Sequence, residues 1–261
     1  VSRDGSSDVC SSDLVSGVLT AGGHPLLVVG TAGSTNTGAA DDLLAIADLC
    51  EEHGLWFHVD GAYGAAAAMH ASGRETLSGM ERADSVVVDP HKWLFQPYDI
   101  ACVWVRKPGV LEQTFAMYPE YLADLRGDEV DLHNRGLELS RRARAVKLWL
   151  TMRAYGTDVL AAAISRGVAL AEYAEEAVRA EGSFHIVSPA QLGIVTFATD
   201  QDAAAHSRAA AAITADGYAA VSTTVLAGRT VLRLCTINPR TTTADIDGTV
   251  ARLAAVMRLS V

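Results

Sequence analysis

The chain has 261 residues, of which 49% are hydrophobic and 20% charged, and this composition excludes a largely disordered protein. Its 21 Lys and Arg against 31 Asp and Glu give a net charge of −10, without the basic clusters on which non-specific nucleic-acid binding depends. No apolar run approaches the roughly 18 residues of a membrane-spanning helix. We therefore expect neither a nucleic-acid nor a membrane partner.

The four cysteines, Cys10, Cys50, Cys102 and Cys235, are widely spaced and form no C-x-x-C pair. This spacing fits a reducing compartment better than a disulfide framework or a structural zinc site. We expect a cytoplasmic protein without a bound metal.

Residues 1–14 read VSRDGSSDVCSSDL, a Ser- and Asp-rich stretch with no hydrophobic period. The stretch lacks the apolar core and the basic start of a signal peptide. We expect a disordered or non-native leader without function, with the natural chain joining near Val15.

Short apolar runs and a helical stretch alternate in the first half of the chain. Residues 41–53 predict a helix, because apolar side chains recur on one face and Gly54 follows. Four runs predict strands that are buried on both faces, namely residues 26–30, 55–59, 85–88 and 100–105. This alternation predicts an α/β fold with a parallel sheet.

The second half begins with a polar stretch, residues 119–135, which is a candidate mobile loop. Two helices are then predicted on either side of Gly156, over residues 141–155 and 159–180. Strands at residues 192–198, 220–226 and 230–236, a helix at 202–216 and a closing helix through Met257 follow. We expect three parts: the leader 1–14, an α/β part 15–150 and a smaller α+β part 151–261.

Three polar segments follow predicted strands, where open α/β sheets bind ligands: GTAGSTNTG, HVDGAY and DPHKW. In the second, an apolar strand runs into Asp60, which either caps the next helix or needs a hydrogen-bonded or cationic partner. In the third, Lys92 precedes apolar Trp93, Leu94 and Phe95. A lysine in such surroundings either extends its amino group to solvent or loses its proton and becomes a nucleophile.

An amine that can hold a carbonyl compound and an acid that can keep a ring nitrogen protonated are the two groups that pyridoxal phosphate requires. A metal-dependent hydrolase is the rival interpretation, with His58, Asp60, Asp89 and His91 as ligands. Against it, Pro90 breaks the second strand and Lys92 would bring a positive charge into the metal site.

In type, order and spacing these motifs resemble those of the group II pyridoxal-phosphate-dependent amino-acid decarboxylases, nearest to the aromatic-L-amino-acid decarboxylases. The resemblance runs from about residue 26 to the C-terminus and includes SRRARAVKLW. It implies the fold type I, aspartate-aminotransferase-like architecture: a partial large domain with a mostly parallel sheet and a smaller α+β C-terminal domain. The family's N-terminal part is not found before Val15, so the chain resembles the C-terminal portion of such an enzyme.

The resemblance also implies roles for single residues. Lys92 would bind the cofactor aldehyde covalently, and Asp60 would pair with the pyridine nitrogen. Ala62 would pack on the ring face, His91 would lie by the phosphate and the lysine, and Thr35 would lie near the ring.

Two further positions come from the same resemblance. Tyr121 matches a loop tyrosine that protonates the substrate carbon after carbon dioxide leaves. Asp89 stands where some relatives have asparagine near the phosphate, and its carboxylate would repel that group unless it is turned away.

The implied activity is decarboxylation of an L-amino acid, aromatic in the favoured interpretation, to the amine and carbon dioxide. The implied assembly is a homodimer, and the implied ligands are pyridoxal 5'-phosphate and a small amino acid. Glutamate or diaminobutyrate decarboxylation, aldehyde synthesis, and an inactive fragment remain open alternatives.

Overall fold

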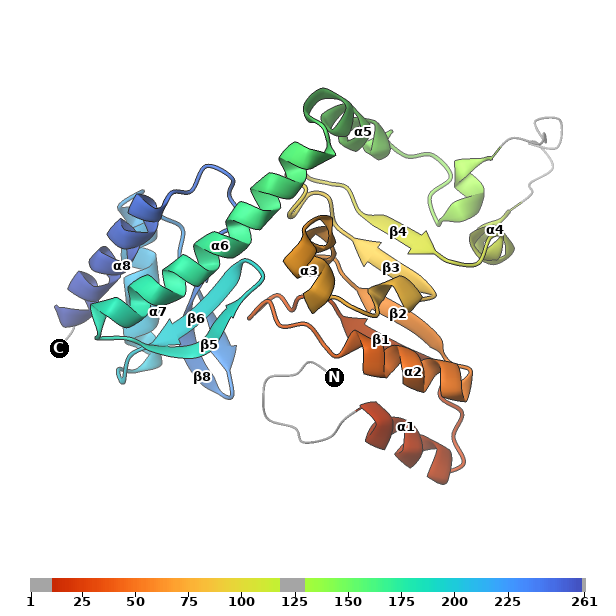
Figure 1. Ribbon diagram of the computed structural model, residues 1–261, viewed down its shortest axis with the longest axis horizontal. Coiled ribbons are helices and arrows are strands. Elements are labelled where there is room, and N and C mark those ends of the chain that lie inside the picture. The colour runs from red at the N-terminus through yellow and green to blue at the C-terminus, as the bar shows by residue number, and fades with distance from the viewer. Residues whose placement is uncertain (1–10, 118–129, 260–261) are drawn as a thin grey trace.

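The computed structural model of the protein describes residues 11–117 and 130–259 (Figure 1). Its first helix, α1 (Ser11–Thr20), begins inside the stretch expected to be a disordered leader, so residues 11–14 are helical. Residues 1–10 of that stretch lie outside the described residues.

The first sheet has four strands in the order β1 (Leu27–Thr31), β2 (Trp56–Asp60), β3 (Ser85–Val88) and β4 (Cys102–Val105). The first three are parallel, as predicted, whereas β4 runs antiparallel to β3. The sheet is therefore mostly parallel, as expected. Strand β4 is the exception, because no helix crosses back between β3 and β4 and a parallel pair requires such a crossover.

Helix α2 (Leu43–His53) confirms the predicted helix and covers one face of this sheet. The Asp42 side chain caps it by accepting a hydrogen bond from Ala45 N, and Gly54 ends it at φ 64°, a left-handed conformation that glycine adopts without strain. Its apolar face shares a core with β2, and the shared buried residues are Leu43, Ile46, Cys50, Phe57 and Val59.

The strands at the two edges of the first sheet are less buried than predicted. Leu27 is 52% exposed, Val29 49% and Val103 52%, all on the face that α2 does not cover. Trp104 is 70% exposed on the other face of β4. Burial on both faces is therefore wrong for β1 and β4, because helical cover in this chain reaches only part of the sheet.

The second sheet is antiparallel, in the order β5 (His185–Gln191), β6 (Ile194–Ala198), β8 (Arg229–Cys235) and β7 (Ser222–Leu226). Its core is shared with three helices, α6 (Thr157–Glu181), α7 (Ala203–Ala215) and α8 (Thr243–Arg258). Strand β5 was not predicted. It contains Pro189, which is tolerated because β5 lies at the edge of the sheet.

Helix α6 joins the two sheets and follows α5 (Arg144–Tyr155) after a turn at Gly156 (Figure 1). Ile164 of α6 belongs to the core of the first sheet, whereas Leu170 and Ala174 belong to the core of the second. One helix thus supports both cores, which ties the position of one sheet to that of the other.

Short helices complete the described chain. They are η1 (Gly64–Met69), α3 (Ala71–Thr76), η2 (Met80–Arg82), α4 (Val110–Phe115) and η4 (Leu132–Arg135). The last of these occupies the end of the segment expected to be a mobile loop, and residues 119–129 of that segment lie outside the described residues.

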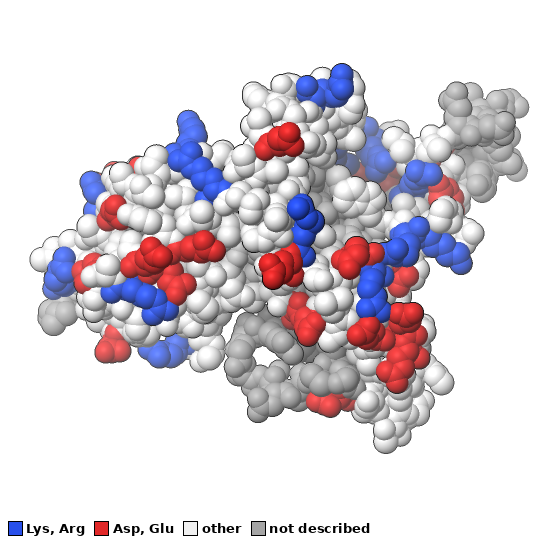
Figure 2. Space-filling model, viewed as in Figure 1, with Lys and Arg blue, Asp and Glu red and all other residues white. Residues whose placement is uncertain are grey.

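Basic and acidic side chains are interspersed on the face of the molecule shown in Figure 2. Among the helices within residues 11–117 and 130–259, none is long and apolar enough to cross a bilayer.

Candidate active site at the carboxyl edge of the first sheet

The three polar segments follow neighbouring strands and meet at one edge of the first sheet. Thr31 is paired with Asp60 across β1 and β2, and Asp60 with Val87 across β2 and β3. Two backbone hydrogen bonds then join the turns beyond these strands: Gly61 N donates to Val87 O at 3.1 Å, and Asp89 N donates to Ala62 O at 3.1 Å. The segments that carry Asp60 and Lys92 are therefore joined directly by backbone hydrogen bonds.

Asp60 is the last residue of β2 and is exposed. Its Oδ1 accepts a hydrogen bond from Ala62 N at 3.1 Å, which fixes the turn after the strand. The following helix, η1, has Tyr63 at its N-cap and no side-chain cap, so the interpretation of Asp60 as a helix cap is wrong. The carboxylate faces solvent at the sheet edge and is open to a donor from a ligand.

The surroundings of Lys92 matter for its chemistry. Trp93 and Leu94 are buried as expected, but the Lys92 side chain is 37% exposed and its Nζ lies 2.9 Å from Asp89 Oδ2. Of the two alternatives for this lysine, the structure shows the amino group reaching partly into solvent, where it pairs with a carboxylate. Lys92 N donates to Asp89 O at 2.9 Å, and this turn sets the lysine side chain beside the carboxylate three residues earlier.

His91 lies on the other side of the same carboxylate. The backbone of Ile100 lies against one side of the ring, with its O 2.5 Å and its N 3.3 Å from His91 Nδ1. On the other side His91 Nε2 lies 3.8 Å from Asp89 Oδ2, and the ring meets Tyr98 edge-on with centroids 5.0 Å apart. Asp89 is thus turned toward Lys92 and His91.

Sequence reasoning missed Asp89 as the partner of Lys92. The signal was available, since an acid and a lysine three residues apart meet wherever the chain makes one helical turn. In the sequence, Pro90 indicated that the strand ends there, but it did not indicate that the chain then makes such a turn.

Thr35 is exposed in the loop after β1, and its backbone binds the second sheet. Arg233 Nε of β8 donates to Thr35 O at 3.0 Å. Ser34 Oγ and Thr37 Oγ1 lie 2.8 Å apart and brace the same loop. No sequence signal could identify Arg233, because it reaches the loop from 198 residues away.

The rival metal site is not assembled. His58 Nδ1 hydrogen-bonds to Ser85 Oγ at 2.8 Å, and Trp56 Nε1 donates to the same oxygen at 2.8 Å. Within the described part of the chain, no group of three or more His, Cys, Asp or Glu side chains is placed to hold a metal ion. His58, Asp60, Asp89 and His91 therefore do not form the metal site that the metal-hydrolase interpretation requires.

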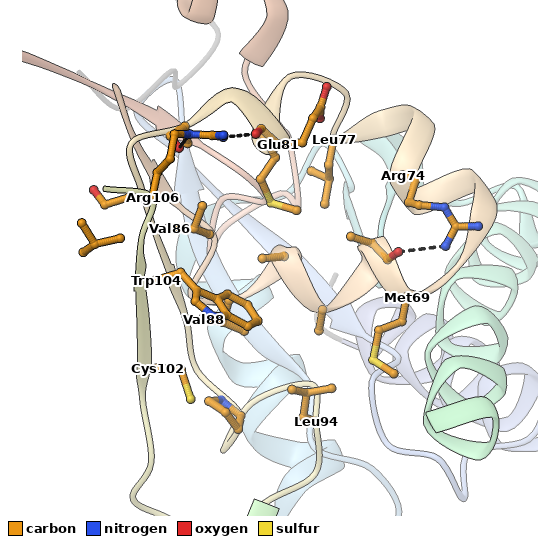
Figure 3. A pocket seen from close by; sticks show the side chains of 18 of the residues that line it. Met69, Arg74, Leu77, Glu81, Val86, Val88, Leu94, Cys102, Trp104 and Arg106 are labelled. Atoms are coloured by element: carbon orange, nitrogen blue, oxygen red, sulfur yellow. Dashed lines mark hydrogen bonds between the residues drawn. The ribbon is translucent and has the colours of Figure 1, made fainter. Parts of the chain in front are cut away.

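A cavity of about 1120 Å³ lies over β3 and β4 (Figure 3), and its lining includes Pro90 and Leu94 of the segment that carries Lys92. Most of its lining is apolar, as Figure 3 shows for Met69, Leu77, Val86, Val88 and Trp104. Neither Asp60 nor Lys92 lines it, so its size does not bear on the chemistry of that pair.

A family profile described as the pyridoxal-dependent decarboxylase conserved domain matches residues 11–200. The chain belongs to this family. It is 44% identical over 238 residues to the aromatic-L-amino-acid decarboxylase of Bacillus atrophaeus, covering 87% of this chain and 50% of the relative. It is 38% identical over 190 residues to the phenylacetaldehyde synthase of a Rosa hybrid cultivar, covering 72% of this chain and 36% of the relative.

Solved structures agree with the family assignment. The crystal structure of Oryza sativa TDC with PLP and tryptamine matches with a TM-score of 0.86 and 30% identity, covering 97% of this chain and 55% of that one. The fold is therefore that of the fold type I pyridoxal-phosphate enzymes, as the resemblance implied. The chain spans about half the length of the Bacillus decarboxylase and of the Oryza sativa structure.

The residues at the sheet edge fit pyridoxal phosphate in their chemistry. The edge offers an amine on Lys92, an exposed carboxylate on Asp60, and the small side chain of Ala62 between them in sequence. An aldehyde, a pyridine nitrogen and a flat ring face need these three features respectively.

Proposed function

We propose that the protein decarboxylates an aromatic L-amino acid to the amine and carbon dioxide with pyridoxal 5'-phosphate as cofactor. One observation carries the proposal: two backbone hydrogen bonds join the turns that contain Asp60 and Lys92 at the carboxyl edge of the sheet. The chain in which this occurs belongs to the pyridoxal-dependent decarboxylase family. The similarity to an aromatic-L-amino-acid decarboxylase supports the substrate class.

Each residue of the site has a defined part in this proposal. Lys92 holds the cofactor through its amino group, and Asp60 accepts a hydrogen bond from the ring nitrogen and keeps it protonated. When bound, pyridoxal phosphate supplies an electron-poor ring that takes up the electron pair left by the departing carboxylate. Ala62 leaves room for the ring face, and His91 and Thr35 border the cofactor. Orientation of the scissile bond by the protein decides which bond breaks.

Asp89 holds the ammonium form of Lys92 before the cofactor arrives. Only the neutral amine attacks an aldehyde, so the lysine must pass its proton on as it reacts.

Tyr121 lies outside the described residues, and its role is proposed from the sequence resemblance. It would deliver a proton to the substrate carbon after carbon dioxide leaves.

Aldehyde synthesis is the second candidate function, because the rose phenylacetaldehyde synthase is 38% identical to this chain. Product analysis separates the two: amine with carbon dioxide supports decarboxylation, and aldehyde with ammonia and peroxide supports the alternative.

The test is a visible absorption spectrum of the protein with pyridoxal phosphate, before and after borohydride, for the wild type and Lys92→Ala. We expect borohydride to fix the cofactor on the peptide that carries Lys92 and on no peptide of the variant. Equal trapping in both proteins would overturn the assignment of Lys92. A substrate panel of aromatic amino acids, glutamate and diaminobutyrate then tests the substrate class.

A homodimer in a reducing compartment completes the proposal. Trp149 and Leu150 of α5 are 60% and 53% exposed, an apolar surface of the kind that a second subunit covers. The described cysteines, Cys50, Cys102 and Cys235, are free thiols, which supports a cytoplasmic location. Sedimentation of the protein tests the oligomeric state.

A further inference from the structure

Two aromatic rings lie stacked directly behind the candidate site. Tyr63 and Trp93 have ring centroids 5.1 Å apart and planes inclined by only 7°. Trp93 is fully buried and Tyr63 is 8% exposed. Trp93 follows Lys92 in the chain, and Tyr63 comes three residues after Asp60. The stack therefore joins the two turns that carry the proposed cofactor ligands.

The stack sits against two glycines from the other half of the fold. A methyl group at Gly193, before β6, would lie 2.9 Å from Tyr63 Oη and 3.2 Å from Trp93 Cζ2. A methyl group at Gly167, in α6, would lie 3.2 Å from Thr236 O and 3.3 Å from both Trp93 Cζ2 and Trp93 Nε1. These two glycines form what we call the glycine slot, and an added methyl group at either position would press on the rings.

A buried threonine holds the two sides of the slot together. Thr236 Oγ1 lies 2.7 Å from Gly167 O and 3.2 Å from Gly193 O, and Thr236 N donates to Gly193 O at 2.9 Å. The slot is thus a rigid part of the second sheet and of α6.

Packing, not hydrogen bonding, fixes Trp93 in the slot. Its Nε1 is buried and has no hydrogen-bond partner among the described residues. Burial raises the pKa of the Tyr63 phenol well above its usual value, so the ring stays neutral. The position of both rings consequently depends on the shape of the glycine slot.

We propose that Tyr63 and Trp93 are positioning residues: their packing against the glycine slot determines where the Lys92 side chain lies. The proposal rests on the function assigned to Lys92 above. A movement of the rings passes to the lysine through one peptide unit at Trp93, and to Asp60 through the turn at residues 61–63. The second sheet and α6 thereby control the geometry of a site to which they contribute neither the amine nor the acid.

The test uses four variants of the protein and measures the lysine itself. Gly193→Ala presses on Tyr63 Oη, and Gly167→Ala presses on Trp93. Gly193→Ala/Tyr63→Phe removes the oxygen that the new methyl group meets. Gly17→Ala, in α1, is the matched control, because nothing lies within 4 Å of its added methyl group.

The readout is the rate at which acetic anhydride acetylates Lys92 in the cofactor-free protein, followed by peptide mass spectrometry. The rate of borohydride-trapped cofactor attachment is measured in parallel, and far-UV circular dichroism confirms folding. We expect Gly193→Ala and Gly167→Ala to change both rates about fivefold, since a misplacement of about 1 Å can cost roughly 100-fold in rate and these contacts require smaller shifts. In the double variant both rates should return toward the wild-type values. In Gly17→Ala both rates should equal the wild-type values.

Unchanged Lys92 acetylation in folded Gly193→Ala and Gly167→Ala would overturn the positioning role. If Gly193→Ala does not fold, Gly167→Ala decides the question, because its methyl group sits in a helix and meets Trp93 less closely. Altered acetylation together with cofactor attachment on another residue would instead overturn the proposed function and leave the positioning role intact.

Discussion

Lys92 Nζ lies 2.9 Å from Asp89 Oδ2, in a turn where the two side chains are three residues apart. This carboxylate stabilises the ammonium form of the lysine, whereas the neutral amine attacks an aldehyde. The Lys92 side chain is 37% exposed, so solvent weakens the pair.

Replacement of Asp89 by asparagine should therefore speed the attachment of pyridoxal phosphate to the protein at neutral pH. We expect about a threefold increase in the rate, a size typical of a solvent-screened ion pair. The growth of the visible absorption band measures it. Glu52→Gln, exposed on α2, removes one negative charge elsewhere and should leave the rate unchanged. A slower reaction in Asp89→Asn would show that the carboxylate assists the lysine as a proton acceptor instead.

Asp60→Asn tests the carboxylate that is proposed to face the ring nitrogen. Asparagine keeps an oxygen for the bond to Ala62 N, so the turn should persist. The loss of charge should weaken cofactor binding about tenfold, the usual cost of a hydrogen bond to a charged group. Spectral titration with pyridoxal phosphate measures the affinity. Asp42→Asn is the control, because asparagine caps α2 as well as aspartate does.

The elements that the sequence predicted correctly are those whose stabilising contacts are local. Helix α2 is defined by its apolar period, by Asp42 at one end and by Gly54 at the other, all within a short stretch. Likewise, the polar residues after β1, β2 and β3 meet at one edge because parallel strands end together.

The features that the sequence could not predict depend on distant partners. The direction of β4 follows from a connection without a helix, and β5 forms although it contains Pro189 because its neighbour β6 supplies the hydrogen bonds. The contact of Arg233 with Thr35 and the seat of Trp93 against Gly167 join residues from opposite halves of the chain. Composition and period carry no information about such pairings.

Arg233→Met should loosen the loop after β1 without unfolding the protein. The side chain donates one hydrogen bond, to Thr35 O at 3.0 Å, and the loss of such a bond costs about 1 kcal/mol. We expect faster amide hydrogen exchange over residues 32–38 and an almost unchanged unfolding midpoint in urea. Arg229→Met, exposed at the start of the same strand, should not alter exchange in that loop. Equal exchange in both variants would show that Arg233 does not hold the loop.

His206 of α7 is buried in the core of the second sheet, where it is 2% exposed. Its Nε2 accepts a hydrogen bond from Thr199 N at 3.0 Å, so the folded protein holds the ring in its neutral form. Burial is the main cause that lowers the pKa of His206 below its usual value of 6.5, and Arg229 and His185 add to the effect. The backbone of Asp202 and the Asp202 carboxylate oppose it.

This direction fixes the sign of the pH dependence of stability. Below about pH 6.5 the unfolded chain binds a proton at His206 that the folded protein does not bind, so the free energy of unfolding falls as the pH drops through that range. Above pH 6.5 both states are neutral and the contribution is constant. Urea unfolding at pH 7.5 and pH 5.5 should show a smaller loss of stability in His206→Gln than in the wild type. His53→Gln, exposed at the end of α2, should lose as much as the wild type. If His206→Gln and His53→Gln lose equal stability between pH 7.5 and pH 5.5, then protonation of His206 does not cause the pH dependence of the unfolding free energy.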